Sequence, residues 1–353
     1  MRTVDVLVVG MGPGGASAAA EAAAAGRSVL AVERNRRLGE PVQCAEFIPN
    51  PMGRYARPEG VLQQRVTGMK TMLPSGAVEA SEFPGLMIDR AAFDRAIAQR
   101  AIEAGAEVLT GTRLVALDAE RRVATCADKT QRFDVAYELI IAGDGPHSPV
   151  AELLGLPPLE IVYTRQYTVP LLRPYADTDI WLSDDYPGGY GWLFPKGAVA
   201  NLGLGADREF EDNLKRPLEA LHEALVAQGL LGREILARTG GAIPVGGPRE
   251  HLVEGCALFV GDAAGLTHPI TGAGIHAAVV SGEAAGRAAA AYLAGDENAL
   301  EDFEEDVLDQ FEPGLRRAVE RRASLKNCWR TPAAAEDANM RRGWIAFDEY
   351  FAA

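Results

Sequence analysis

Cysteine is scarce and scattered in this sequence. The four cysteines form no C-x-x-C pair and have no histidine partner at the spacing of a metal site. We therefore expect neither a disulfide framework nor a zinc site, an iron–sulfur cluster or any other bound metal. The residues are Cys44, Cys126, Cys256 and Cys328.

Basic residues are also fewer than acidic residues. The 353 residues include 35 lysines and arginines against 49 aspartates and glutamates, a formal net charge of −14. A nucleic-acid-binding protein usually carries a basic excess or patch, so this function is not expected. The 48% of hydrophobic and 24% of charged residues are ordinary globular values and exclude wholesale disorder. The length predicts two domains or one elaborated domain.

Long apolar runs and a signal sequence are both lacking. The longest apolar stretches contain Gly, Glu or Arg within 20 residues, so no transmembrane helix is predicted. The first residues run directly into a strand-like segment, without the ordered regions of a signal peptide. We expect a cytoplasmic protein, and an interfacial segment that contacts a membrane peripherally is compatible with the sequence.

The N-terminal segment has the pattern of a βαβ unit. Residues 4–9 form an apolar run typical of a strand in a parallel sheet, and a glycine turn and an alanine-rich helix follow. Residues 28–33 predict a second strand, which completes a unit of about 30 residues. The motif Gly10-x-Gly12-x-x-Gly15 lies between strand and helix, the context that dinucleotide binding requires. A chance glycine turn is the alternative.

An acidic residue closes the second predicted strand. Glu33 comes 18 residues after Gly15, where a carboxylate accepts hydrogen bonds from ribose hydroxyls and repels a 2′-phosphate. The predicted dinucleotide site comprises Gly10, Gly12, Pro13, Gly14, Gly15, Glu33 and Arg34.

Beyond residue 33 the composition and the predicted secondary structure of the chain change twice. Residues 34–85 are rich in Pro, Gly and Arg and are expected to be mostly loop, followed by a helix over 90–104 and strands up to 144. Strand-like segments between 157 and 210, followed by a helical stretch over 211–229, predict an inserted antiparallel sheet with a helix. The predicted division is 1–156 and 251–296 for a Rossmann-type α/β cofactor domain, 157–250 for an antiparallel-sheet substrate domain and 297–353 for a helical C-terminal segment.

A second motif specifies the dinucleotide. Gly261-Asp262 follows an apolar strand, and THPITGAGIH then opens a helix. Here the sequence resembles the flavoproteins built like p-hydroxybenzoate hydroxylase. The resemblance implies FAD, with Asp262 on its ribityl chain; a helix N-cap is the alternative role. A helix that starts near Ile275 would direct its positive end at the flavin edge, where reduction leaves negative charge. The implied flavin-ring loop contains Pro269, Gly272, Ala273, Gly274 and Ile275, with Gly261 before it.

Three further positions match the same flavoproteins. Asp144-Gly145 follows a predicted strand and resembles their Asp-Gly pair near the FAD pyrophosphate, although an ordinary strand-end turn would look alike. Arg90 resembles their arginine that heads a helix beside the cofactor; a solvated arginine is the alternative. Leu114 is placed near adenine by its position only.

Three segments resemble the geranylgeranyl reductase family. They are GEPVQCAE (39–46), YPGGYGWLFPK (186–196) and GDAAGLTHPITGAGIH (261–276). This family reduces isolated carbon–carbon double bonds in prenyl chains, so the resemblance implies that activity here. The sequence departs from the family at Phe47, where many members have Gly, and at Ala273, where Glu is common. The chain is also shorter beyond residue 300. These departures bear on the substrate more than on the fold.

The candidate catalytic residues come from the first two of these segments. Tyr190, Trp192 and Phe194 alternate along a predicted strand, so their side chains share one face that would wall an apolar channel; domain core is the alternative. Cys44, beside Ala45 and near the flavin by resemblance, is a soft wall residue or proton donor, and an inert buried thiol is equally compatible. Lys196 either neutralises a phosphate head group or lies in solvent. The catalytic candidates are Cys44, Tyr190 and Trp192.

The predicted function is an FAD-dependent reductase of double bonds in a prenyl or other lipid-like substrate, acting by hydride transfer from reduced flavin. The alternative is an FAD monooxygenase that uses NAD(P)H and oxygen. The electron donor is NAD(P)H or a ferredoxin: no second GxGxxG follows a strand, which excludes a separate nicotinamide domain, and the acidic net charge disfavours an acidic ferredoxin.

Overall fold

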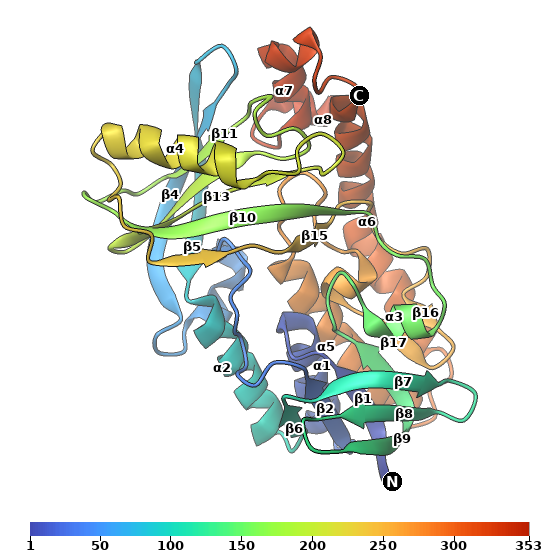
Figure 1. The fold of residues 1–353 in the computed structure, drawn as a ribbon. Coiled ribbons are helices and arrows are strands. Elements are labelled where there is room, and N and C mark those ends of the chain that lie inside the picture. Colours follow the sequence, from blue (N-terminus) through green and yellow to red (C-terminus); the bar gives the residue numbers. More distant parts are fainter. Residues whose placement is uncertain (353) are drawn as a thin grey trace.

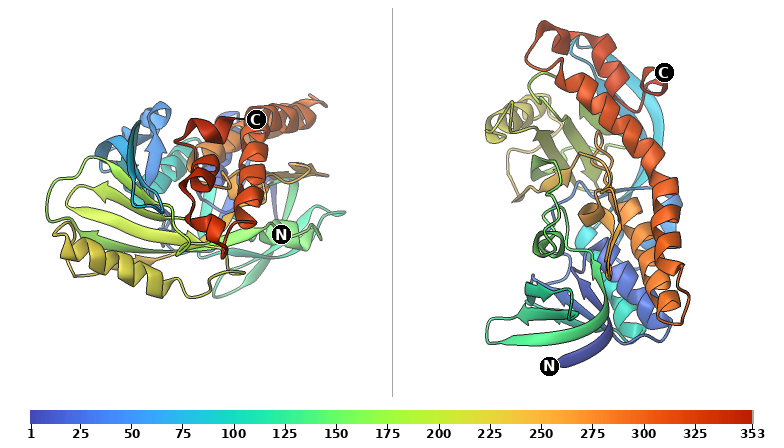
Figure 2. Two further views of the ribbon diagram at one scale, coloured as in Figure 1. Left: turned by 90° about the horizontal axis from the view of Figure 1, so that it is seen from above. Right: turned by 90° about the vertical axis from the view of Figure 1, so that its right-hand side faces the viewer.

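The computed structural model describes residues 1–352 and contains two β-sheets, one beyond the other. Figure 1 shows the sheet that contains β1 near the N-terminus and the second sheet above it. The long helix α6 (Ala299–Lys326) runs alongside both, as the right view of Figure 2 shows. The two sheets are therefore connected by chain crossings and by this helix.

The first sheet is built around a parallel core. Its order is β16-β17-β9-β1-β2-β6, with β7 and β8 forming a hairpin against β9. Val8 in β1 lies opposite Ala31 in β2 and Ile141 in β9, and both pairings are parallel. The strands are β1 (Arg2–Val9), β2 (Val29–Glu33), β6 (Glu107–Thr110), β7 (Arg113–Asp118), β8 (Val123–Ala127), β9 (Arg132–Ala142), β16 (Val253–Glu254) and β17 (Ala257–Phe259).

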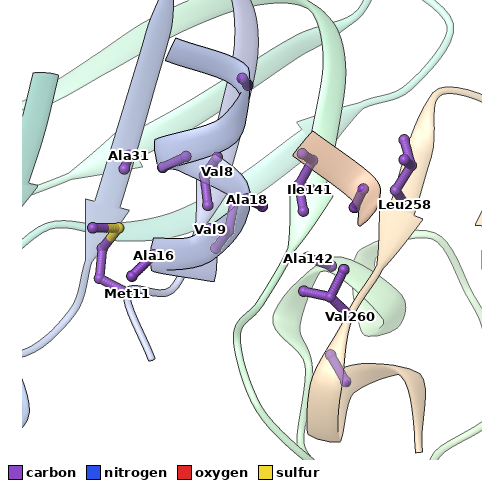
Figure 3. Packing of buried hydrophobic residues seen from close by; sticks show 14 of the residues in the cluster. Val8, Val9, Met11, Ala16, Ala18, Ala31, Ile141, Ala142, Leu258 and Val260 are labelled. Atoms are coloured by element: carbon purple, nitrogen blue, oxygen red, sulfur yellow. The ribbon is translucent and has the colours of Figure 1, made fainter. Parts of the chain in front are cut away.

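Small residues let helices pack closely on this sheet. Helix α1 (Pro13–Ala24) packs against α2 (Arg90–Glu103) and α5 (Ile275–Tyr292). Figure 3 shows Ala16 and Ala18 of α1 close to Val8 and Val9 of β1. The backbones of α1 and α5 nearly touch, because a Cβ added at Gly282 would lie 2.1 Å from the carbonyl oxygen of Gly14. The alanine-rich sequence thus produces a tight helix–sheet layer.

The second sheet is mainly antiparallel. Its order is β14-β10-β13-β12-β11-β4-β5-β3, and β15 pairs with β10. Helix α4 (Lys215–Ala227) covers one face with Leu218, Leu221 and Leu225. The strands are β3 (Phe47–Pro49), β4 (Leu62–Met72), β5 (Val78–Ile88), β10 (Ile161–Pro170), β11 (Thr178–Trp181), β12 (Gly191–Lys196), β13 (Val199–Ala206), β14 (Ala237–Thr239) and β15 (Ala242–Pro244).

Short helices complete the chain. The α-helices are α3 (Pro149–Leu153), α7 (Asp337–Gly343) and α8 (Asp348–Phe351), and the 3₁₀ helices are η1 (Asn50–Ala56), η2 (Gly261–Ala264) and η3 (Pro332–Ala335). Three of them, η3, α7 and α8, follow α6 in the chain and lie near the second sheet in Figure 1. Within residues 1–352, no helix is both long enough and apolar enough to span a bilayer.

The expectation of loop over residues 34–85 is wrong. Strands β4 and β5, of eleven residues each, form a hairpin there, and β3 pairs with β5. Half of β4 is solvent-accessible and carries polar side chains, and β5 contains Pro84 and Gly85, so neither shows a buried strand's pattern. The segment 47–88, predicted within the cofactor domain, pairs with the second sheet.

The other expected elements are confirmed with small shifts of their ends. The helix expected over 90–104 is α2, and the helix expected near Ile275 is α5, which begins at that residue. The C-terminal segment 297–353, expected to be helical, begins with α6. Tyr190 precedes β12 instead of lying within it, because the strand begins at Gly191.

Candidate active site

One cavity of about 370 Å³ lies where the two sheets and the C-terminal segment meet. Its glycine part is lined by Gly12, Pro13, Gly14, Gly145, Gly261, Asp262, Gly272, Ala273, Gly274 and Ile275. Its apolar part is lined by Phe47, Met69, Phe83, Ile180, Trp192, Phe194, Trp344 and Ile345. Cys44, Ala45, Glu46, Arg90 and Tyr190 also line the cavity.

The glycine turn after β1 is tightly constrained on one side and open on the other. A Cβ at Gly10, whose φ is +89°, would lie 2.4 Å from the carbonyl oxygen of Gly143, and one at Gly15 would lie 1.9 Å from that of Gly10. At Gly12 no atom lies within 4 Å of such a Cβ. No side chain caps the N-terminus of α1, and its first turn carries no acidic residue. This helix end can therefore receive an anionic group.

Six predicted cofactor residues do not line the cavity. Glu33, at the end of β2, accepts hydrogen bonds from the backbone nitrogens of Met11 (2.9 Å) and Asn35 (2.8 Å). Leu114 is buried in β7 opposite Cys126 in β8, and Arg34 is exposed. Those outside the lining are Gly10, Gly15, Glu33, Arg34, Leu114 and Asp144.

Asp144 has one buried oxygen atom without a partner. Its Oδ2 accepts a hydrogen bond from the backbone nitrogen of Val150 at 3.0 Å, whereas its buried Oδ1 has no hydrogen-bond partner among residues 1–352. Burial raises the pKa of this carboxyl to about 6. Gly143 and Gly145, on either side of Asp144, line the cavity, so this carboxyl lies close to it.

Asp262 faces the cavity from η2, directly after β17. Its Oδ1 accepts a hydrogen bond from Thr267 Oγ1 at 2.6 Å. Burial raises the pKa of this carboxyl, while the Thr267 hydroxyl opposes the increase. The alternative role as a helix N-cap is wrong, because Val260 and Gly274 occupy the N-cap positions of η2 and α5.

The Cys44-Ala45-Glu46 segment is held by polar side chains of the second sheet. Gln166 Nε2 donates to the carbonyl oxygen of Cys44 at 3.0 Å, and Asn201 Nδ2 donates to that of Ala45 at 3.2 Å. The backbone nitrogen of Glu46 donates to Cys44 Sγ at 3.1 Å. Burial raises the pKa of the Cys44 thiol, and the positive charge of Arg90 opposes this increase.

Glu46 is a buried carboxylate with three partners. Its side chain is 5% exposed, and its Oε2 lies 2.6 Å from Lys196 Nζ and 2.7 Å from Asn201 Nδ2. Its Oε1 accepts a hydrogen bond from the backbone nitrogen of Arg90 at 2.9 Å. Lys196 is therefore paired inside the protein, and the expected role in solvent is wrong, while the role on a head group stays a prediction.

Arg90 begins α2 and lines the cavity. Its Nε donates to Asp94 Oδ1 at 2.7 Å, one turn further along the helix. The alternative of a solvated arginine is wrong, since only 18% of the side chain is exposed.

Tyr190 and Trp192 connect the two parts of the cavity. The Tyr190 hydroxyl donates to the carbonyl oxygen of Thr271 at 2.6 Å, and its ring lies 5.6 Å from Trp192 and 4.8 Å from Trp344 between centroids. Trp192 Nε1 donates to Gln166 Oε1 at 3.1 Å. Gln166 thus links the indole to the backbone of Cys44. Both aromatic residues line the cavity and also pack in a hydrophobic cluster.

Comparisons with known proteins specify the family. A family model described as FAD dependent oxidoreductase matches residues 5–141. Digeranylgeranylglycerophospholipid reductase of Methanocaldococcus jannaschii is 35% identical over 328 residues, covering 87% of this chain and 81% of that protein. The chain belongs to the geranylgeranyl reductase family of FAD-dependent oxidoreductases.

Two further members of the family support this membership. Digeranylgeranylglycerophospholipid reductase 1 of Methanopyrus kandleri is 35% identical over 87% of this chain and 88% of that protein. The crystal structure of a geranylgeranyl bacteriochlorophyll reductase-like protein from Thermoplasma acidophilum has a TM-score of 0.84 and 26% identity, covering 97% of this chain and 96% of that one. The predicted family, α/β fold and enzyme class are confirmed.

The cavity of this reductase fits its family's cofactor. The open face at Gly12 and the uncapped α1 N-terminus suit a pyrophosphate. The unpartnered Asp144 oxygen suits a hydroxyl donor of the same cofactor. The α5 N-terminus has no side-chain cap and no acidic residue in its first turn, which suits a ring that becomes negative on reduction.

Several site residues of this reductase escaped sequence reasoning. Asn201 is the one polar residue of the otherwise apolar strand β13, and that isolation is the signal that would have identified it. Gln166 lies among other polar residues of β10, so no such signal marks it. Glu46 stands inside a recognised motif without an assigned role. Trp344 and Ile345 lie in a segment without a recognised motif, and only the structure brings them to the cavity.

Proposed function

We propose that this enzyme reduces isolated carbon–carbon double bonds in the prenyl chains of a lipid. The observation that carries the proposal is a continuous cavity, in which a glycine part suited to FAD continues into an aromatic, apolar part. The names of the relatives, reductases of digeranylgeranylglycerophospholipid, support the same substrate class. Bound reduced FAD would supply a hydride to one alkene carbon, and a proton must reach the other.

For the cofactor we propose contacts along the glycine part. The turn around Gly12 would hold the pyrophosphate, Glu33 the ribose and Asp262 the ribityl chain, while the loop before α5 would lie against the ring. The proposed cofactor residues are Gly10, Gly12, Pro13, Gly14, Gly15, Glu33, Arg34, Cys44, Ala45, Arg90, Leu114, Asp144, Gly145, Gly261, Asp262, Pro269, Gly272, Ala273, Gly274 and Ile275.

Cys44 is the proposed proton donor. Its S–H bond breaks as a C–H bond forms at the second alkene carbon, and the thiolate later regains a proton from water. The charge of Arg90 and the backbone N–H of Glu46 favour the thiolate, which makes the transfer less costly in a buried site. Gln166 and Asn201 hold the backbone carbonyls of Cys44 and Ala45, so the thiol has a fixed place at the cavity.

Tyr190 and Trp192 would position the alkene and exclude water. An isolated alkene has no carbonyl group to delocalise charge, so orientation in a dry cavity must supply much of the rate. The hydrogen bonds of both residues point away from the alkene, to Thr271 and to Gln166, and their ring surfaces remain for apolar contact.

The electron donor is NAD(P)H or a ferredoxin. NAD(P)H would bind transiently, since the chain has one glycine motif of the Rossmann type. Stopped-flow reduction of the bound flavin by NADH, NADPH and reduced ferredoxin, each alone, decides between them.

Peripheral contact with a membrane is part of the proposal. Leu172 and Leu236 are 60% and 49% exposed, and the exposed Arg173 and Arg233 lie on the same chain segments. Exposed leucines beside arginines suit an anionic lipid surface. Sedimentation with vesicles rich in phosphatidylglycerol, compared with pure phosphatidylcholine vesicles, tests this contact.

The function is tested by mass spectrometry of a geranylgeranyl lipid incubated with chemically reduced enzyme. We expect a product heavier by two hydrogen atoms, formed without oxygen. A product heavier by one oxygen atom, formed only in air, would establish the monooxygenase alternative instead. An unchanged lipid beside reoxidised flavin would contradict this substrate class.

A further inference from the structure

The apolar part of the cavity ends in three stacked aromatic rings. Phe47 is in the middle, with its ring centroid 5.5 Å from that of Phe83 and 5.9 Å from that of Phe194, at interplanar angles of 16° and 21°. The three residues come from β3, β5 and β12, and all of them line the cavity. Phe47 and Phe83 are half-buried.

An aromatic wall leads from the glycine part to this stack. It starts at Tyr190, which is bonded to Thr271 in the glycine-rich loop. The Trp192 ring follows at 5.6 Å, and Phe194 comes two residues later on the same face of β12, about 7 Å further along the strand. A prenyl chain laid along this wall from the glycine part would therefore meet Phe47.

The position of Phe47 is fixed on both sides. Its ring lies against the backbone of Gly85, where an added Cβ would be 2.1 Å from the ring carbon Cζ. The preceding residue, Glu46, is held by Lys196 and Asn201. Phe47 also pairs with Met87 in the sheet. The ring is thus a firmly held part of the cavity wall.

We propose that Phe47 limits the length of the prenyl chain that fits beyond the reacting double bond. This assignment of a specificity-determining residue rests on the proposed function. Each additional CH₂ group that can be buried contributes about 0.8 kcal/mol, which is about fourfold in affinity. An isoprene unit that is stopped by the Phe47 ring cannot be buried and adds no binding free energy. In a shorter chain every unit is buried and adds binding free energy.

The test measures binding without turnover. Prenyl alcohols of increasing length, from two to six isoprene units, are titrated in detergent micelles into the FAD-loaded, oxidised enzyme and the Phe47→Ala variant. In the wild type we expect affinity to rise with length and then level off. In Phe47→Ala we expect the levelling to occur at least one unit later, with affinity for the first longer alcohol at least tenfold above that of the wild type.

Phe210→Ala is the matched control. Phe210 is half-buried and its ring packs 5.7 Å from Trp329 beside the same hydrophobic cluster, but it does not line the cavity. We expect the control to level off at the wild-type length. If Phe47→Ala is poorly folded, Phe47→Leu should shift the same limit by a smaller amount.

An unchanged limit in folded Phe47→Ala or Phe47→Leu would overturn the proposal. Binding of prenyl alcohols by an enzyme that leaves geranylgeranyl lipid unreduced would count against the proposed function alone, and the limit would still decide the role of Phe47. A wild type that binds none of the alcohols would overturn both.

Discussion

Asp144 follows strand β9 and Asp262 follows strand β17 of the first sheet. The hydrogen-bond partners of the two carboxylates differ. Asp262 Oδ1 receives the Thr267 hydroxyl, whereas Asp144 Oδ1 has no partner among the residues described. An unpartnered buried oxygen is costly unless a ligand supplies its hydrogen bond. The two residues therefore respond differently to substitution and to pH.

Substitution of Asp262 should remove the cofactor. Asp262→Ala deletes the carboxylate that faces the glycine part, so we expect soluble protein with little bound FAD. The absorbance of flavin relative to protein after purification measures this. Asp306→Ala, which changes an exposed carboxylate on α6, is the control and should retain full FAD. Full FAD in Asp262→Ala would contradict the assignment.

Substitution of Asp144 should change how the stability of FAD-free protein depends on pH. Its pKa is raised from 3.8 to about 6, so the folded state holds this proton more tightly than the unfolded state. The stabilising contribution of the protonated group is present below pH 4 and is lost as pH rises through 6. Asp144→Asn should therefore gain about 1–3 kcal/mol relative to wild type between pH 4 and pH 7.

Urea unfolding of the FAD-free proteins at pH 4, 5, 6 and 7 checks this expectation. The difference between the two proteins should grow with pH. A constant difference would mean that Asp144 titrates alike in the folded and unfolded states.

At the scale of elements, the contact between α1 and α5 depends on glycine. Both helices pack on the sheet that carries the glycine turn, and their separation fixes where the two N-termini lie. Because each N-terminus borders the glycine part, helix spacing and site geometry are set together.

Gly282→Ala should push these helices apart. The new Cβ would lie 2.1 Å from the carbonyl oxygen of Gly14, so we expect a loss of about 1–3 kcal/mol in the free energy of unfolding, with weaker FAD binding. Gly314→Ala in α6 is the matched control, since nothing lies within 4 Å of a Cβ there. That variant should be more stable by about 1 kcal/mol. Chemical unfolding and FAD titration are carried out on both variants. Equal changes in unfolding free energy and FAD affinity would contradict the close packing of α1 and α5.

The sequence predicts an element or a motif when the residues that define it are close together in the chain. The glycine turn lies between a strand and a helix, so its spacing predicted it, and Gly261-Asp262 was recognised by its resemblance to a motif of known flavoproteins. The pairing of Glu46 with Lys196 joins residues 150 positions apart, and no local pattern contains it. Strands β4 and β5 escaped because neither alternates regularly. The register of β4 shifts between Val66 and Gly68, and β5 is mostly exposed at first and buried over its last four residues.

For the whole molecule, α6 connects the two sheets. Its N-terminal half packs beside the first sheet and α5, while its buried Arg322 reaches the second sheet. Arg322 Nη1 donates to the carbonyl oxygen of Gly188 at 2.6 Å, and Nη2 lies 3.1 Å from Asp207 Oδ2. The helix therefore holds together the two walls of the cavity.

Arg322→Met should be strongly destabilising. It leaves the Asp207 carboxylate, whose side chain is 13% exposed, without its closest charge partner, so we expect a loss of about 3 kcal/mol or more. Lys326→Met is the control on the same helix, because that ammonium lies 3.9 Å from Asp207 and is more exposed. It should cost less than about 1 kcal/mol. Urea unfolding compares them, and similar losses would mean that Arg322 contributes little to this connection.

The residues that line the cavity are spread over almost the whole chain. The cavity can therefore be completed only late in the synthesis of the protein. The lining starts at Gly12 and includes Trp344 and Ile345. A ribosome adds about 5–20 residues per second, so roughly 20–70 seconds separate the synthesis of the glycine turn from that of the final wall. During translation a newly completed first sheet, whose last strand is β17, would offer FAD a surface that still lacks Trp344 and Ile345. Tight retention of the cofactor should therefore begin only after residues 344–345 have left the ribosome.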